Sequence, residues 1–185
     1  MKILRITRPG GPEVLALEER AAPVPGASEL LVRVHATALN RADLLQIQGH
    51  YPSPPGVAAD VAGLEYAGEV LAVGPLVRRF QVGDRVMGLV SGGAFAEQLI
   101  THEREALHVP EGLDFVQASA LPEAYLTAFD ALVLQAGLRL GETVLIHAVA
   151  SGVGSAAAQI CRALGARDDV VGVGLALVLQ PLAVG

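Results

Sequence analysis

The sequence contains one cysteine, no tryptophan and only 4% aromatic residues among its 185 positions. A single thiol, Cys161, excludes an internal disulfide and any zinc site built from several cysteines. This cysteine usage predicts a protein of the reducing cytoplasm. Because aromatic side chains are so scarce, stacking on nucleic-acid bases is not an expected function.

Charged residues are also few, at 17%, and the formal net charge is −6. An acidic chain offers no basic face to nucleic acid or to anionic lipid, so we expect neither as a partner. Hydrophobic residues make up 52% of the chain, which is too many for a disordered protein. The composition therefore predicts a folded chain.

Apolar residues do not form a run that reads as a membrane span. Residues 1–14 alternate charged and apolar side chains, unlike a signal peptide. The longest run without an acidic or basic residue, 143–161, is interrupted by two glycines. A buried strand followed by a buried helix explains it better than a transmembrane helix, which needs about 20 apolar residues. We therefore expect no membrane partner.

Turn residues divide the chain into a β-rich part and a part in which helix and strand alternate. Before Pro110, short apolar runs separated by glycine and proline are typical of strands. The strands are expected over residues 30–36, 69–73, 84–90 and 95–101, with one helix over 41–48. After Pro110, the pattern predicts a helix over 122–136, a strand over 143–148 and a helix over 155–164.

The segment after the predicted strand over 143–148 carries the clearest chemical signal. Residues 151–157 read Ser-Gly-Val-Gly-Ser-Ala-Ala. Phosphate binding requires free backbone N–H groups at a helix N-terminus and small residues that allow close approach. Strand, glycine turn and helix in this order open a dinucleotide-binding unit. A purely structural turn is the alternative, because short glycine pairs are common in a glycine-rich chain.

Longer motifs resemble those of a known family. The stretch GETVLIHAVASGVGSAAAQICRALGA (141–166) is similar to the signature of the zeta-crystallin-like quinone oxidoreductases, in the zinc-free branch of the medium-chain dehydrogenase/reductase superfamily. Upstream segments agree with it in order and spacing, namely 38–56, 63–70, 82–89 and 121–132. The resemblance implies a mixed β and α/β fold. A GroES-like β-barrel domain is expected over 1–121, then a linking helix and the first βα unit of an incomplete Rossmann domain over 122–166.

The zinc-dependent relatives differ from this sequence at the metal-binding positions. They place a cysteine where this chain has Asn40 and a histidine where it has Leu64. Five histidines are scattered without the spacing of metal ligands, at His35, His50, His102, His108 and His147. We therefore predict that the chain binds no metal.

The resemblance also implies roles for individual residues. The residues expected to orient or polarise the acceptor are Tyr51, Asn40 and Ser151. Those expected to bind the cofactor are Asn40, Asp43, Thr127, Ser151, Gly152, Val153 and Gly154. Structural alternatives stay open: Tyr51 packs on neighbouring prolines, Asp43 caps a helix or pairs locally, and Thr127 faces other helices. Glu65 and Glu123 lie in the motifs, and neither is assigned a catalytic role.

The implied activity is hydride transfer from NADPH to a quinone without a metal. Enoyl-thioester reductases share the scaffold and are the alternative within the same class of enzyme. The expected partner is therefore a small molecule, either a quinone or an activated alkene. The family forms homodimers through its nucleotide-binding domain.

The resemblance ends after Ala166. Residues 167–185 read as an aberrant apolar tail, in which 170–179 is a candidate second strand. No acidic residue for a ribose hydroxyl and no basic residue for a 2′-phosphate follows that strand, so the sequence does not distinguish NADPH from NADH. We expect a truncated or frameshifted family member that has lost its dimer interface. A non-catalytic remnant is the alternative to an enzyme.

Overall fold

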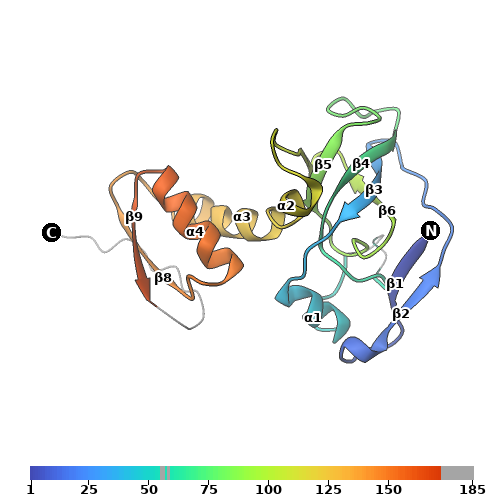
Figure 1. The fold of residues 1–185 in the computed structure, drawn as a ribbon, viewed down its shortest axis with the longest axis horizontal. Coiled ribbons are helices and arrows are strands. Elements are labelled where there is room, and N and C mark those ends of the chain that lie inside the picture. Colours follow the sequence, from blue (N-terminus) through green and yellow to red (C-terminus); the bar gives the residue numbers. More distant parts are fainter. Residues whose placement is uncertain (55–56, 58, 172–185) are drawn as a thin grey trace. The chain divides into compact units, whose positions relative to one another are not determined.

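The computed structural model describes residues 1–54, 57 and 59–171 (Figure 1). The chain divides into two compact units, and each is described by itself. Unit 1 is Met1–Pro122, and unit 2 begins at Glu123. Each unit has a hydrophobic core of its own.

Unit 1 is built around a five-stranded antiparallel sheet with the strand order β6-β3-β4-β5-β7. Its strands are β3 (Glu29–Ala36), β4 (Glu65–Val73), β5 (Arg85–Leu89), β6 (Gln98–His102) and β7 (Ala106–His108). In β3, Leu30 and Val32 lie two residues apart and are fully buried, as the period of a half-buried strand requires. The pairing of β3 with β4 shifts register twice, and such irregularities bend a strand and curl its sheet.

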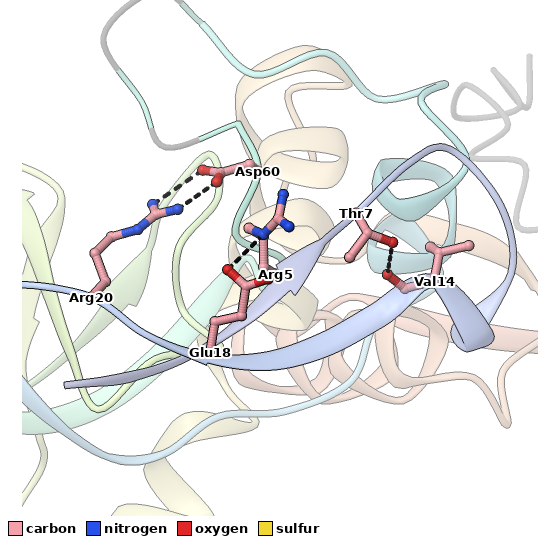
Figure 2. Close-up of polar contacts among 6 residues, drawn as sticks. All are labelled: Arg5, Thr7, Val14, Glu18, Arg20 and Asp60. Atoms are coloured by element: carbon pink, nitrogen blue, oxygen red, sulfur yellow. Dashed lines mark hydrogen bonds and ion pairs between the residues drawn. The ribbon is translucent and has the colours of Figure 1, made fainter.

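A separate hairpin joins β1 (Lys2–Ile6) to β2 (Leu15–Glu19) through the short 3-10 helix η1 (Pro12–Val14). Figure 2 shows the polar contacts that hold it. Arg5 pairs with Glu18 across the hairpin at 2.8 Å, and the Thr7 hydroxyl donates to the Val14 carbonyl at 2.7 Å. Arg20 makes two contacts with the Asp60 carboxylate, which ties the end of the hairpin to the start of the segment that leads into β4.

Two short helices complete the described secondary structure of unit 1. Helix α1 (Arg41–Ile47) follows β3, and α2 (Phe115–Ser119) follows β7. Asp114 caps α2 by accepting the Gln117 N–H at 2.7 Å, and the Gln117 side chain accepts the Asp114 N–H in return. This reciprocal pair satisfies two amides that have no partner within the helix.

Unit 2 consists of a helical segment followed by a strand, a helix and a strand. Helix α3 (Pro122–Phe129) continues as a π-helix, η2 (Asp130–Gln135). Then come β8 (Thr143–His147), α4 (Gly152–Ala163) and β9 (Arg167–Val171). Strands β8 and β9 pair in parallel, with α4 as the crossover between them. The core is formed by β8, α4 and the α3–η2 segment, and it includes Ala128, Leu132, Val144, Ile146 and Cys161.

The sequence predictions agree with most of these elements but differ from the structure at several boundaries. Helix α4 begins at Gly152 rather than residue 155, because Ser151 caps it. The helix predicted over 122–136 changes from α to π geometry at Asp130. Strand β9 begins at Arg167, inside the predicted tail, and most of the strand expected over 170–179 lies outside the described residues. Strands β1, β2 and β7 and helix α2 were not predicted.

The described helices are all too short or too polar to cross a bilayer.

Candidate functional site

The turn between β8 and α4 is fixed by side-chain and backbone hydrogen bonds. The Ser151 hydroxyl accepts the Gly154 N–H at 3.0 Å and so caps the helix. The Ser155 hydroxyl donates to the Val149 carbonyl at 3.0 Å. Ala148 has a φ of 53°, a backbone conformation that non-glycine residues seldom adopt, and it turns the chain out of β8. The predicted glycine turn is therefore a defined strand-to-helix connection.

The two glycines of this turn have different roles. A Cβ on Gly154 would lie 2.4 Å from the Ala148 carbonyl oxygen and 2.7 Å from the Val149 Cα. Glycine at this position therefore allows the helix to approach the backbone that follows β8. A Cβ on Gly152 would meet nothing closer than the Ala124 Cβ at 3.8 Å. Gly152 is exposed, and it leaves open space in front of the first turn of α4.

This geometry fits the pyrophosphate of a dinucleotide. The first backbone amides of a helix have no hydrogen-bond acceptor within the helix. Of these amides, the Ser151 hydroxyl accepts the N–H of Gly154. The amides of Gly152 and Val153 lie in the same turn, at the positive end of the helix dipole. The space in front of Gly152 allows an anion to approach these N–H groups. Ser151, Gly152, Val153 and Gly154 are thus brought together as the sequence predicts, and their role in binding stays a prediction.

Thr127 lies in α3 with its side chain exposed. A side-chain hydrogen bond also joins α3 to α4: the Tyr125 hydroxyl donates to the Gln159 side chain at 2.7 Å. Sequence reasoning did not single out this pair. A tyrosine and a glutamine on successive amphipathic helices carry no spacing signal that distinguishes them from ordinary surface residues. The cofactor contact expected of Thr127 stays a prediction.

In unit 1, Asn40 lies between two carboxylates. It precedes α1, and its backbone N–H donates to Asp43 Oδ2 at 2.6 Å. Its side-chain Nδ2 donates to Glu65 Oε1, also at 2.6 Å. Asp43 belongs to the first turn of α1, and Glu65 is the first residue of β4. The local capping role considered for Asp43 is therefore present, and Glu65 proves to be a structural partner of a predicted site residue.

Both carboxylates are almost completely buried: Asp43 is 3% exposed and Glu65 is 2% exposed. Burial raises the pKa of Asp43, because a charged carboxylate loses its hydration. The hydrogen bond from Asn40 opposes this shift, and the negative charge of Glu65 adds to it. Asn40 thus donates one hydrogen bond to each member of a buried acidic pair.

Gln46 extends this cluster along α1. It is 4% exposed, and its Oε1 accepts the Gly63 N–H at 3.1 Å. Gly63 has a φ of 99°, and a Cβ there would lie 2.6 Å from the Phe95 backbone nitrogen. Sequence reasoning missed Gln46. The only signal for it was its position three residues after Asp43, which places both side chains on one face of the helix.

Tyr51 lies in the loop after α1 and is 42% exposed. Nearby, the Ser53 hydroxyl donates to the Ser91 carbonyl at 3.0 Å and attaches this loop to the segment after β5. The catalytic role expected of Tyr51 stays a prediction. The structure therefore brings the predicted site residues together in two groups, Asn40 with Asp43 in unit 1 and residues 151–154 in unit 2.

A groove of about 410 Å³ in unit 1 is lined by residues other than the predicted site residues. It is lined by Lys2, Ile3, Leu4, Leu17, Val34, His35, Ala36, Thr37, Ala94, Phe95, Ala96 and Glu97. Thr37 connects the groove to the acidic pair, because its hydroxyl donates to the Glu65 carbonyl at 2.6 Å. Over the described part of the chain, no three His, Cys, Asp or Glu residues are grouped so that they could hold a metal ion.

Comparison with known proteins gives consistent similarities. Residues 26–111 match the alcohol dehydrogenase GroES-like domain family. The chain is 38% identical over 168 residues to human quinone oxidoreductase, covering 89% of this chain and 50% of that protein. It is 40% identical over 152 residues to the mouse synaptic vesicle membrane protein VAT-1 homolog-like, covering 82% of this chain and 36% of that protein.

A solved structure with a similar fold is that of CurK enoyl reductase. The TM-score is 0.83 and the sequence identity 32%, and the match covers 91% of this chain and 53% of that one. The chain thus spans half or less of the length of the two curated relatives, and about half of this solved structure.

Proposed function

Because the chain belongs to the zeta-crystallin-like quinone oxidoreductase family of the medium-chain dehydrogenase/reductase superfamily, we propose that it binds a nicotinamide dinucleotide and reduces a quinone. The cofactor we propose is NADPH. The observation that carries the proposal is the turn from β8 into α4, where a capped helix N-terminus, a close-packed Gly154 and an open Gly152 occur together. A turn with only a structural role has no need of the open approach at Gly152.

The proposed chemistry assigns a task to each group of residues. NADPH supplies the hydride when it is bound. The first-turn amides of Gly152 and Val153 hold the pyrophosphate, and the Ser151 hydroxyl keeps that turn in shape. The Tyr51 hydroxyl donates a hydrogen bond to the acceptor oxygen and so stabilises the negative charge that develops there. Asn40 orients the acceptor, and Asp43 and Thr127 contribute to the binding of the cofactor.

We propose that this reaction proceeds without zinc. The support comes from the residue types at the positions that bind zinc in the metal-dependent relatives. Asn40 is a poor zinc ligand, Leu64 is not a ligand at all, and the chain has one cysteine, which lies buried in α4. Polarisation of the acceptor must then come from hydrogen bonds. A cytoplasmic location stays a prediction.

Reduction of an enoyl thioester is the second candidate function. The similarity to CurK enoyl reductase favours it, because the TM-score of 0.83 covers 91% of this chain, although the sequence identity of 32% is lower than the 38% to human quinone oxidoreductase. The reactions differ in the atom that receives the hydride. A paired assay with a benzoquinone and a crotonyl thioester, each with NADPH in excess, separates the two by the ratio of their kcat/KM values.

Cofactor binding is tested by thermal unfolding with and without NADPH. A ligand that binds only the native state raises the melting temperature, so we expect a shift that grows with NADPH concentration. The matched variant is Gly152→Asp, whose carboxylate enters the open space and repels the pyrophosphate. An acidic residue in a first turn favours the helix, so this variant should fold normally and lose the shift. A wild-type chain that shows no shift at saturating NADPH would contradict the proposed function.

A further inference from the structure

Asn40 is held by both of its donors at once. Its backbone N–H donates to Asp43 and its side-chain Nδ2 to Glu65, each at 2.6 Å. The two acceptors come from different elements, α1 and β4. Glu65 lies 25 residues after Asn40 in the sequence. Hydrogen bonds to a charged acceptor in a buried site are among the strong ones. The position and the direction of the Asn40 amide are therefore both fixed.

Glu65 also holds the other end of the same segment. The Thr37 hydroxyl donates to the Glu65 carbonyl at 2.6 Å. Residues 37–40 connect β3 to α1, so Glu65 fastens this connection at its first and its last residue. Glu65 itself is fixed by β4, where it pairs with Leu89 of β5. The connection that presents Asn40 is thus attached to the central sheet through one residue.

A carboxylate orients an amide in a way that an uncharged partner does not. An ionised carboxylate only accepts hydrogen bonds, whereas an amide side chain donates from nitrogen and accepts at oxygen. Glu65 therefore forces the NH₂ group of Asn40 toward itself and turns the carbonyl oxygen to the opposite side. A glutamine at position 65 would tolerate either orientation of the Asn40 amide.

We infer that Glu65 is a positioning residue, which acts on the acceptor only by fixing the orientation of the Asn40 side chain. The effect of Glu65 on catalysis rests on the proposed function. The orientation of the Asn40 side chain by Glu65 rests on the hydrogen bonds described above. In this role, the buried glutamate of the Gly63-Leu64-Glu65 motif orients a side chain and does not contact a metal. Asp43 completes the arrangement by taking the backbone N–H of the same residue.

The test is Glu65→Gln, with Glu69→Gln as the matched control. Both glutamates lie on β4, but Glu69 is half-buried and faces His35 at 4.0 Å instead of Asn40. In the full chain, the ¹⁵N-resolved NMR signal of the Asn40 side-chain NH₂, assigned with Asn40→Asp, reports its bond to Glu65. We expect Glu65→Gln to shift this signal and to speed its hydrogen exchange, while Glu69→Gln leaves it unchanged.

The kinetic readout is the split between kcat and KM with NADPH and a benzoquinone. A misdirected Asn40 impairs orientation in the transition state, so Glu65→Gln should lower kcat by about 10-fold or more, with little change in the KM for NADPH. Glu69→Gln should keep the wild-type kcat. An unchanged NMR signal or an unchanged kcat in Glu65→Gln overturns the inference. If the wild-type chain is inactive, the proposed function fails, and the NMR signal still decides whether Glu65 orients Asn40.

A double variant covers the case in which Glu65→Gln does not fold. Asn40→Asp alone places two carboxylates next to each other and should lower the melting temperature. Combined with Glu65→Gln, it restores one donor and one acceptor with the roles exchanged. The double variant should therefore melt above the Asn40→Asp single variant while it stays catalytically impaired. A double variant no more stable than Asn40→Asp contradicts the pairing.

Discussion

The cores of the two units are built from side chains of different size. In unit 1, the main cluster between the strands contains leucine, valine, tyrosine and phenylalanine side chains. In unit 2, five of the nine buried core residues are alanine, and three of these, Ala156, Ala157 and Ala158, lie on α4. Unit 1 thus gains stability from the area its side chains bury, whereas unit 2 depends on side chains that are small or absent.

The same contrast holds for polar groups. Unit 1 buries two carboxylates and an amide, Asp43, Glu65 and Gln46, which accept hydrogen bonds from Asn40 before α1 and from Gly63 before β4. In unit 2, the predicted binding residues Ser151 and Gly152 lie at the N-terminal end of α4 and are exposed to solvent. A buried polar site orients groups rigidly, while an open helix end is suited to receive a charged ligand.

The largest expected effect comes from removing a large side chain from unit 1. Leu30 is fully buried between strands, so Leu30→Ala should lower the free energy of unfolding by about 2–5 kcal/mol. The control is Leu17→Ala, because Leu17 is 70% exposed. That change should stay within about 0.5 kcal/mol. Urea unfolding followed by circular dichroism measures both, and equal effects would show that unit 1 does not depend on its buried area.

The second prediction adds a methyl group to unit 2. Gly154→Ala places a Cβ 2.4 Å from the Ala148 carbonyl oxygen and should destabilise the β8–α4 turn by about 1–3 kcal/mol. Gly152→Ala is the matched change, since its Cβ lies 3.8 Å from the nearest atom. Hydrogen exchange of the α4 and β8 amides should therefore accelerate in Gly154→Ala only. Accelerated exchange in both variants would argue against a difference between the two glycines.

The third prediction uses the buried carboxylate of unit 1. The pKa of Asp43 is raised in the folded state, so between its unfolded and folded pKa values the native state binds more protons than the unfolded state. The free energy of unfolding should therefore fall as pH rises through this window. Asp43→Asn should remove this dependence, as measured by urea midpoints from pH 3.5 to 7. A difference between wild type and variant that does not change with pH would contradict the raised pKa.

The smallest effect is expected at the exposed ion pair shown in Figure 2. The Arg20 guanidinium lowers the pKa of Asp60, so this pair stabilises the fold above the unfolded pKa and loses its effect as pH falls. The sign is opposite to that of Asp43. Both side chains are more than one-third exposed, so Asp60→Asn should cost no more than about 1 kcal/mol at neutral pH. A larger cost that persists in high salt would mean that the pair is not a surface interaction.

Local sequence patterns account for much of the fold. The strand over 30–36, the helix over 41–48 and the βα unit after Gly141 each depend on neighbours within a few residues, through side-chain period, caps and turn residues. One helix boundary differs from the predicted one because of a cap: Ser151 accepts the Gly154 N–H, so α4 starts three residues early. The glycine turn was predictable because it, too, depends on neighbouring residues.

The sequence by itself determined the family motifs and the glycine turn, since these are properties of residue type and spacing. Only the tertiary structure decided that Glu65 lies against Asn40 and that Asp43 is buried beside it. Those contacts depend on how β4 packs beside the connection from β3 to α1. The free energy of a buried charge is set by that packing, and residues 25 positions apart carry no local signal of it.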